Sequence, residues 1–345
     1  MFYIRADANQ TIASGHMMRC IAIGKELEKM GIQVAFLCAQ MEGVVFGEKY
    51  GFTCHCLQTA YNHLDTETDS IVEYLKPKKA EGILVDSYFV TEKYLHTLNQ
   101  VAKVAYIDDL DKMQYPVDLL IQYGDSTQEK KVYYNEKYQQ TNTKLLLGHK
   151  YIPLREEFQS VGSEQRNGSV LLTTGASDPY NIQVEFLTYL RDNEKSFFEK
   201  INFDVIVGKF HKYEKELEEL AIYHKNIRIH KDVVEMAEYM RKASVCISAG
   251  GTTLFELCAC GTPTVSFTFA DNQIAGAEYL YKEGLVYYGG DVREGRKILF
   301  QKIQRKVKEL ITNSKLQIEL SKKMQYHVDG QGARRIAQEI KTLIL

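Results

Sequence analysis

The sequence predicts an α/β protein with two domains, each built on a parallel β-sheet. Predicted strands and helices alternate along both halves of the 345-residue chain. Two of the predicted strands, 82–86 and 101–109, are continuous apolar runs that end in aspartate, a pattern typical of parallel strands buried on both faces. A chain of this length exceeds what one small core holds, which favours two domains over one.

The first half begins with an apolar run at residues 1–4 that alternates into 5–7, which predicts the first strand. A polar loop at 8–15 follows. A helix is expected over about 17–30, with Gly31 as its C-terminal stop. The remaining strands predicted for this half are 33–38, 82–86, 101–109, 119–122 and 144–148.

A polar stretch at 160–168 predicts the linker between domains, so that the expected domains are 1–160 and 161–345. The second half is expected to contain strands at 169–175, 203–208, 227–230, 245–248 and 264–268, and helical segments at 297–320 and 332–345. The final helices have room to pack back on the N-terminal domain. Two such domains facing each other would place the loops at their switch points in one shared cleft.

Composition is that of an ordinary soluble globular protein, with 45% hydrophobic and 26% charged residues. The net charge of −2 indicates no nucleic-acid partner. No apolar stretch approaches the roughly 18 residues of a membrane span, and the first strand begins at Met1 without a signal peptide. The close cysteine pairs at 54–56 and 258–260 favour small core residues over a zinc site. We therefore expect a cytoplasmic protein without metal or cofactor, whose oligomeric state the sequence leaves open.

His16 is the most informative single residue, because the pattern places it in the first turn of a helix. The positive end of the helix macrodipole there disfavours the protonated imidazole. A histidine that is neutral at pH 7 can accept a proton, as a general base must. The alternative is a histidine that only caps or packs, and for a lone histidine this alternative is favoured.

A second feature is the segment 248–257, in which paired glycines stand between a predicted strand and a helix. Gly250 and Gly251 let the backbone approach a ligand closely, and the first-turn N–H groups can bind an anion. Glu256, three residues after Thr253, can offer a carboxylate to ribose hydroxyls. The alternative is that Thr253 and Glu256 form a capping box beside a tight turn. The segment matches neither the GxGxxG fingerprint nor the Walker A loop.

Polar residues also follow other predicted strands. Residues 173–178 occupy the place of a phosphate or sugar loop, and residues 269–273 follow the strand at 264–268. In the first half, 86–88 and 108–109 occupy equivalent strand ends. Each of these segments could also be ordinary turn or helix-cap chemistry, so the residues alone leave their role open.

Taken together, these residues resemble a known family, the nucleotide-sugar hydrolase of pseudaminic acid biosynthesis. The most specific part is the segment 12–20 around His16, preceded by Arg5-x-Asp7. The family often has glycine where this chain has Ala13. The resemblance extends over essentially the whole chain. Its shorter matches are 154–158, Asp86-x-Tyr88, Asp108-Asp109, Asn272-Gln273 and the tail 329–335.

The resemblance implies the GT-B fold, with two Rossmann-like domains, similar to the glycosyltransferase that forms lipid II. It implies inverting, metal-independent hydrolysis of UDP-2,4-diacetamido-2,4,6-trideoxy-β-L-altropyranose, which releases UDP and the free sugar for surface polysaccharide biosynthesis. His16 would be the base that activates water. The substrate-binding residues that it implies are Asp7, Gly15, Arg19, Tyr88, Asn272 and Gln273. The implied nucleotide-binding residues are Thr174, Gly175, Gly250, Gly251, Thr252, Thr253 and Glu256.

Two other functions remain open at this point. A glycosyltransferase of the same fold would use His16 to deprotonate an acceptor hydroxyl instead of water. A membrane-associated transferase should carry a basic, apolar patch near its acceptor site, and the absence of an obvious one in the sequence favours the hydrolase. A non-catalytic nucleotide-sugar binding protein would keep the loop at 250–251 but would need no histidine at position 16.

Overall fold

The computed structural model describes residues 1–9, 11–12, 14–159, 165–208 and 210–345. The chain divides into two compact units, which are Met1–Glu156 together with Gly330–Leu345, and Glu157–Asp329. The domain boundary expected after residue 160 lies among residues outside the described ones. The chain returns to the first unit at Gly330, whereas the sequence-based division left the residues up to 345 in the second domain.

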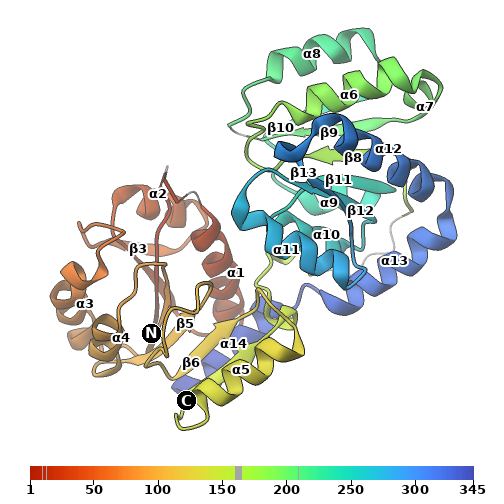
Figure 1. Cartoon of the computed structure of the whole chain (residues 1–345). Helices are drawn as coiled ribbons and strands as arrows, with labels where there is room; N and C mark the ends of the chain where they lie inside the picture. Colours follow the sequence, from red (N-terminus) through yellow and green to blue (C-terminus); the bar gives the residue numbers. More distant parts are fainter. Residues whose placement is uncertain (10, 13, 160–164, 209) are drawn as a thin grey trace. The chain divides into compact units, whose positions relative to one another are not determined.

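The first unit, which carries β3, β5 and β6 in Figure 1, is built on one parallel sheet. Its strand order is β3-β2-β1-β4-β5-β6-β7. Its strands are β1 (Phe2–Ala6), β2 (Val34–Cys38), β3 (Thr53–Cys56), β4 (Gly82–Asp86), β5 (Lys103–Ile107), β6 (Leu119–Gln122) and β7 (Lys144–Leu147). β1, β2 and β4 are buried along their whole length, as the apolar runs of β2 and β4 predict, and β1 buries Arg5 among its apolar residues. β3 was not predicted, because its sequence TCHC contains no apolar run and only alternates between exposed and half-buried residues.

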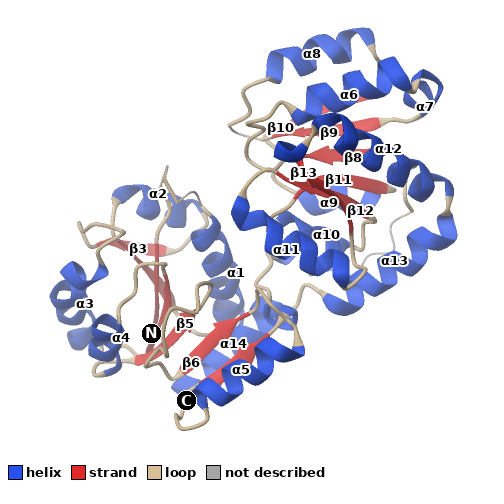
Figure 2. Cartoon of the chain, viewed as in Figure 1, coloured by secondary structure: helices blue, strands red, loops and turns tan. Residues whose placement is uncertain are grey.

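Helices cover both faces of this sheet (Figure 2). They are α1 (Gly15–Lys29), α2 (Met41–Lys49), α3 (Thr68–Leu75), α4 (Glu92–Asn99), α5 (Gln128–Tyr138) and α14 (Gly332–Ile344), with short 3-10 turns η1 (Leu64–Glu67), η2 (Lys76–Lys78) and η3 (His149–Tyr151). A further 3-10 turn, η4 (Glu156–Phe158), includes the residues at which the chain passes from the first unit to the second. One core unites Tyr3 and Val85 of the sheet with apolar side chains of α3, α4 and α5. α1 packs against α14.

The order of the first sheet reverses between β1 and β4. The chain builds outward from β1 through β2 to β3, then returns to place β4 on the other side of β1, with Ala6 beside Asp86. The loops that follow β1 and β4 therefore begin side by side at the carboxyl edge of the sheet. Ligands of open α/β sheets bind at such a switch point. The loop after β1 leads into α1, which carries His16 in its first turn.

The second unit repeats this arrangement with the strand order β10-β9-β8-β11-β12-β13, again parallel. Its strands are β8 (Val170–Thr173), β9 (Phe203–Val207), β10 (Ile227–Lys231), β11 (Val245–Ala249), β12 (Thr264–Thr268) and β13 (Tyr287–Asp291). Its helices are α6 (Ile182–Asn193), α7 (Lys195–Lys200), α8 (Glu214–Tyr223), α9 (Met236–Lys242), α10 (Thr253–Cys260), α11 (Asp271–Lys282), α12 (Arg296–Thr312) and α13 (Ser314–His327), with the turn η5 (Val292–Glu294). Its switch point lies between β8 and β11.

The helix predicted over 297–320 is wrong in one respect, because the structure has two helices there. α12 ends at Thr312 and α13 begins at Ser314. Between them, the side chain of Asn313 accepts a hydrogen bond from the backbone N–H of Leu316 at 3.0 Å and so caps α13. An asparagine at this position starts a new helix even though the apolar period continues across it.

Candidate functional site

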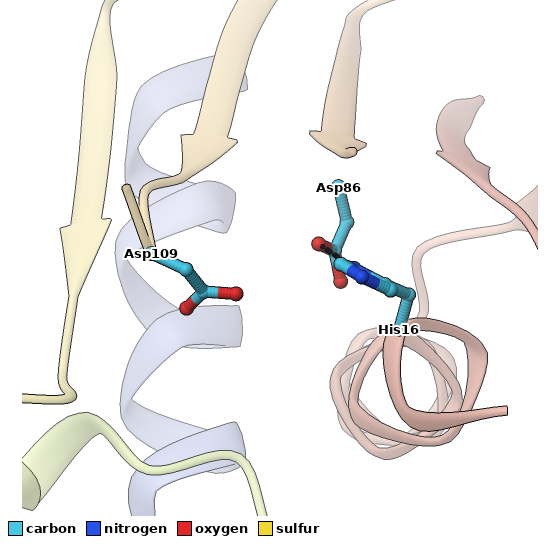
Figure 3. A group of neighbouring side chains, drawn as sticks. All are labelled: His16, Asp86 and Asp109. Atoms are coloured by element: carbon cyan, nitrogen blue, oxygen red, sulfur yellow. Dashed lines mark hydrogen bonds and ion pairs between the residues drawn. The ribbon is translucent and has the colours of Figure 1, made fainter. Parts of the chain in front are cut away.

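A polar cluster lies at the switch point of the first sheet and includes His16, Asp86 and Asp109 (Figure 3). His16 is the second residue of α1, Asp86 is the last residue of β4, and Asp109 follows β5. Their polar ends face one another in Figure 3 although they come from separate elements. The sheet order brings them together, because β4 lies between β1 and β5.

The His16 side chain is held by one ring nitrogen. Its Nδ1 lies 2.6 Å from Oδ1 of Asp86, and the residue is only 7% exposed. The ring of Tyr88 packs edge-on against the imidazole, with ring centroids 4.5 Å apart. Among the described residues, no hydrogen bond to Nε2 of His16 is found. The ring is thus fixed on one side and has an unengaged nitrogen on the other.

Arg19 occupies the centre of the cluster. Its Nε and Nη2 donate to the two oxygens of Asp86 at 2.6 and 2.5 Å, and its Nη1 and Nη2 donate to Asp109 at 3.1 and 2.7 Å. Nη1 also donates to the hydroxyl of Tyr123 at 2.5 Å. Within the described part of the chain, these five bonds use the five N–H donors of a guanidinium. Arg19 was expected to contact substrate, and the structure places its donors on protein groups.

The electrostatics of the cluster follow from burial and from Arg19. Burial by itself would raise the pKa of Asp86, but the adjacent Arg19 guanidinium and His16 hold it well below its usual range. Asp86 is therefore ionised at neutral pH. Burial and the nearby Asp109 carboxylate raise the pKa of the Tyr88 phenol, which stays protonated. The cluster thus contains two carboxylates and one permanent cation.

The donor atoms of His16, Asp86 and Asp109 lie within 4.8 Å of one another, as the ligands of a metal ion would. Arg19 occupies the position that faces all three, because its Nη2 lies 2.5 Å from Asp86, 2.7 Å from Asp109 and 3.2 Å from Nδ1 of His16. A divalent ion would have to displace this guanidinium. The cluster is a network of salt bridges in which the Arg19 guanidinium is the cation.

Asp7 belongs to a separate buried network. Its carboxylate accepts hydrogen bonds from Arg5 at 2.5 Å and from the backbone N–H of Ala39 at 2.7 Å. Arg5 also binds Glu67, which accepts a further bond from Tyr94. The structure therefore does not bring Asp7 into hydrogen-bond contact with His16 or Arg19. Its observed contacts fix the loop after β1 to the start of the loop after β2.

Gly15, the first residue of α1, has open space around it. A Cβ placed there would meet no atom within 4 Å, and the N-cap residue Ser14 makes no side-chain capping bond. The N–H groups of this first turn therefore receive no side-chain cap from Ser14. Ala13, where the family that the sequence resembles often has glycine, lies outside the described residues.

The second unit carries its glycine pair at its own switch point, between β11 and α10. A Cβ on Gly250 would lie 2.9 Å from Cγ2 of Thr268, whereas a Cβ on Gly251 would meet nothing within 4 Å. Packing therefore requires the first glycine, and the second faces open space. α10 begins at Thr253, and its N-cap residue Thr252 makes no side-chain capping bond. Glu256 lies in the first turn of α10.

The loop after β8 lies on the other side of this switch point. Gly175 has a φ of +81°, which a glycine adopts readily, and its N–H donates to Oγ1 of Thr173. Thr174 is 3% exposed, and its hydroxyl has no partner among the described residues. Gly208 approaches this loop so closely that a Cβ there would overlap the carbonyl oxygen of Gly175. The close approach of Gly208 leaves this loop little room to move, and the buried hydroxyl of Thr174 has no hydrogen-bond partner among the described residues.

Asn272 and Gln273 lie in the first turn of α11, after β12. Gln273 accepts a hydrogen bond from the N–H of Phe269 at 3.0 Å, and its Cβ lies beside Gly250. Asn272 is exposed. The structure thus groups Gln273 with the glycine pair, and it places Asn272 one residue away on the same turn.

Sequence reasoning missed the roles of Asp86, Asp109 and Tyr123. The two aspartates stand at strand ends, which is a signal, but the same pattern fits ordinary turns. Tyr123 lies 104 residues from Arg19 in the chain and follows β6, with no local pattern to mark it.

Residues 173–340 match the model of the glycosyltransferase family 28 C-terminal domain. The strand orders of both units and the similar solved structures define the GT-B fold, which confirms the predicted fold class. No helix in the described ranges is both long and apolar enough to cross a membrane.

Two relatives are similar in sequence to most of this chain. The chain is 26% identical over 279 residues to the uncharacterized protein MJ1062 of Methanocaldococcus jannaschii, a match that covers 76% of this chain but only 54% of that protein. The chain thus spans about half the length of this archaeal relative. It is 22% identical over 323 residues to the spore coat polysaccharide biosynthesis protein SpsG of Bacillus subtilis, covering 85% of this chain and 91% of SpsG.

Solved structures extend the similarity over the whole chain at the level of fold. MurG of Acinetobacter baumannii is 15% identical with a TM-score of 0.68, and 99% of each chain is covered. The glycosyltransferase VinC in complex with dTDP is 12% identical with a TM-score of 0.64, again with 99% of each chain covered. S. aureus MnaA, solved with UDP, is 13% identical with a TM-score of 0.65, covering 99% of this chain and 95% of MnaA.

Proposed function

We propose that this chain is a metal-independent hydrolase of a UDP-activated 2,4-diacetamido-2,4,6-trideoxy sugar, which cleaves the glycosyl C–O bond with inversion. The observation that carries the proposal is the state of His16. Its Nδ1 is bonded to the ionised Asp86, while Nε2 is unengaged among the described residues. A histidine ring that is held through one nitrogen and has its other nitrogen unengaged at a switch point is what a general base needs.

In the proposed reaction, Nε2 of His16 removes a proton from water as the water oxygen bonds to the anomeric carbon. The bond from that carbon to the diphosphate oxygen breaks on the opposite face, so the product sugar has the inverted configuration. UDP leaves with the electron pair of the broken bond. UDP is a good leaving group, and backbone N–H groups at a helix start can stabilise its charge without a metal.

We assign nucleotide binding to the switch point of the second unit. Gly251 and Thr252 precede α10 and are exposed, and Thr253 and Glu256 lie in its first turn. We assign the diphosphate to the first-turn N–H groups and the ribose to Glu256. The buried, unpartnered hydroxyl of Thr174 beside Gly175 supports a polar ligand at this loop. The GT-B structures of VinC and MnaA hold dTDP and UDP, which supports a nucleotide ligand for this fold.

We assign the sugar to Tyr88, which is 40% exposed and packs on His16, and to Gly15, Asn272 and Gln273. Arg19 and Asp7 enter the proposal differently. Because their observed bonds go to protein groups, we assign them to holding the site in shape rather than to contacting the sugar. The name of SpsG refers to polysaccharide biosynthesis, which supports a role for this chain in making surface polysaccharides.

A glycosyltransferase is the second candidate. The match of residues 173–340 to a glycosyltransferase domain and the likeness to VinC favour it. In that case His16 would take its proton from an acceptor hydroxyl, and the acceptor oxygen would form the new bond to the anomeric carbon. The two candidates share donor, base and leaving group, and differ in the nucleophile.

The test is to incubate the chain with UDP-activated 2,4-diacetamido sugars in the presence of a metal chelator and without acceptor, and to follow UDP release. We expect release of UDP and a sugar of inverted anomeric configuration. His16→Ala should lower the rate about 10²–10⁴-fold. His96→Ala, which changes an exposed histidine of the same unit, is the matched control and should not alter the rate.

The other outcomes separate the candidates. UDP binding without release contradicts the hydrolase, and release that starts only when an acceptor is added identifies a transferase. Binding with no turnover under either condition leaves a non-catalytic nucleotide-sugar binding protein.

A further inference from the structure

We infer that Asp86 is a positioning residue for His16, whose carboxylate fixes the tautomer with the proton on Nδ1, and that Arg19 keeps this carboxylate ionised. The inference rests on the proposed function in taking His16 as the base. It adds which ring nitrogen is basic and which residues decide this. The relevant atoms come from α1 and from the end of β4.

The first step is the location of a hydrogen. Nδ1 of His16 and Oδ1 of Asp86 are 2.6 Å apart, a distance at which one of the two atoms must carry a proton. Asp86 accepts hydrogen bonds on both oxygens from Arg19, and it is ionised. A carboxylate anion only accepts, so the proton is on Nδ1. In a neutral imidazole the basic lone pair is then on Nε2.

The second step concerns Arg19, which also approaches His16. Nη2 also lies within hydrogen-bonding distance of Nδ1, at 3.2 Å, but the oxygens of Asp86 and Asp109 are nearer, at 2.5 and 2.7 Å. Nη2 carries two hydrogens for these three acceptors, so the two nearer, charged carboxylate oxygens take them in preference to Nδ1. A guanidinium cannot lose its proton in a protein, so the charge beside Asp86 is permanent.

The third step is the rigidity of the arrangement. The Asp86 side chain is fully buried, and its backbone is in register with Ala6 of the neighbouring strand. The far side of the Arg19 guanidinium is held by Asp109 and Tyr123. Tyr88 packs edge-on against the imidazole. A helix therefore carries the ring and Arg19, and the end of a strand carries their shared carboxylate; such elements hold a site more accurately than loops do.

The fourth step is the charge balance when the base takes up a proton. With neutral His16, the carboxylates of Asp86 and Asp109 and the guanidinium of Arg19 leave one negative charge. The thiol of Cys20, 3.4 Å from Asp86, has a pKa raised well above its usual value by burial and by Asp86, so it stays neutral. The phenol of Tyr88 is also neutral. Protonation of Nε2 brings the cluster to zero charge, which stabilises the imidazolium that the reaction forms.

The first test needs no turnover. Long-range ¹H–¹⁵N NMR of the histidine rings in the full-length protein, with the His16 signals assigned by their loss in His16→Gln, reports which nitrogen carries the proton. We expect Nδ1 to be protonated in the wild-type protein. In Asp86→Asn the new amide can donate a hydrogen bond to Nδ1, so the proton should move to Nε2. Asp69→Asn, an exposed change in the same unit, should leave the spectrum of His16 as it is.

A wild-type spectrum with the proton on Nε2 overturns the inference without any variant. So does an Asp86→Asn protein that keeps the proton on Nδ1. If Asp86→Asn does not fold, Arg19→Lys provides a second variant, because lysine keeps the charge but cannot make the bidentate pair. Because the charge beside Asp86 is kept, we expect the proton to stay on Nδ1 in Arg19→Lys, and a proton on Nε2 in this variant contradicts the part assigned to Arg19.

The second test uses the hydrolysis assay. Asp86→Asn should lower kcat about 10²–10⁴-fold and change KM only slightly, since the residue acts through the base. Added to His16→Ala, it should cost little more, because there is no longer a ring to position. Additive losses contradict the inference. Absence of hydrolysis in the wild-type protein contradicts the proposed function instead, and the NMR result then still decides the tautomer.

Discussion

At the scale of single residues, the buried carboxylate of Asp86 organises the polar cluster of the first unit. It accepts hydrogen bonds from Arg19 and Cys20 and is hydrogen-bonded to Nδ1 of His16, and its side chain is fully buried. A buried carboxylate without a cation is costly, and in that case it would be protonated instead. Arg19 is therefore needed for the charge state of Asp86 and, through it, for the chemistry of His16.

Replacing Arg19 by methionine should strongly destabilise the first unit. The change leaves Asp86 buried and Asp109 nearby without their shared cation, and removal of one partner of a buried pair costs about 3–5 kcal/mol. Urea unfolding at pH 7 measures the effect. Lys25→Met is the control in the same helix, because Lys25 pairs with Glu28 on the surface, and such pairs contribute at most about 1 kcal/mol. Equal losses for the two variants would contradict this expectation.

Asp86 should also make stability depend on pH in the acid range. Its pKa in the folded chain is lower than in the unfolded chain, where an aspartate has a pKa of about 4. The unfolded chain therefore binds the proton first, and the contribution of Asp86 is complete above about pH 5 and declines below about pH 4. Urea unfolding at a series of pH values should show the wild type and Asp86→Asn converging as the pH falls.

The control for this pH series is Asp69→Asn, whose carboxylate is exposed. The difference between this variant and the wild type should stay small at each pH. A gap between wild type and Asp86→Asn that widens on acidification would reverse the expected sign.

At the scale of elements, the two glycines between β11 and α10 have different tasks. Gly250 is in contact with Thr268, whose hydroxyl is bonded to Asp291 and Tyr288 and cannot move aside easily. A Cβ added to Gly251 would have no atom within 4 Å. The first glycine therefore serves the packing of the unit, and the second is free to serve a ligand.

We accordingly expect Gly250→Ala and Gly251→Ala to separate stability from binding. Gly250→Ala forces a Cβ to 2.9 Å from Thr268, and overpacking of this kind costs about 1–3 kcal/mol. Gly251→Ala should leave stability within about 0.5 kcal/mol, as surface substitutions do, while weakening UDP binding under the proposed function. Urea unfolding and calorimetric titration with UDP measure the two effects. Equal stability losses would contradict the assignment of packing to Gly250 alone.

At the scale of the whole molecule, the first unit is completed by the last helix of the chain. α14 buries Ala333, Ile336, Ala337 and Ile340, the spacing of one helical face. It packs on α1, the helix that carries His16 and Arg19 (Figure 1). Gly332 lies so close to Ile152 that a Cβ there would overlap the carbonyl oxygen of that residue. The two ends of the chain therefore stabilise one unit.

Ile336→Ala should destabilise the first unit and leave the second unchanged. Ile336 is fully buried, and loss of such a side chain to alanine costs about 2–5 kcal/mol. Hydrogen exchange followed by mass spectrometry should show faster exchange in peptides of 1–156 and no change in those of 165–208 or 210–329. Leu345→Ala, at a residue that is 94% exposed, is the control. Equal acceleration in both units would contradict the division.

Much of this architecture could be predicted from local patterns. Buried parallel strands such as β2 and β4 have continuous apolar sequences, and the glycine pair at 250–251 stands between a strand and a helix as expected. The short strands β3 and β13 were missed because TCHC and YYGGD lack such a run. The break at Asn313 was missed because one capping side chain outweighs a continuing apolar period.

The sequence by itself determined the α/β class, the parallel strands and the place of His16 in the first turn of a helix. These features depend on residues a few positions apart, whose periodicity reflects burial. Only the tertiary structure decided the partners of His16. Asp86 lies 70 residues away, and Arg19 meets Asp109 and Tyr123 across 90 and 104 residues. Those contacts exist because the sheet order places β4 between β1 and β5, and no local pattern encodes the order in which strands assemble.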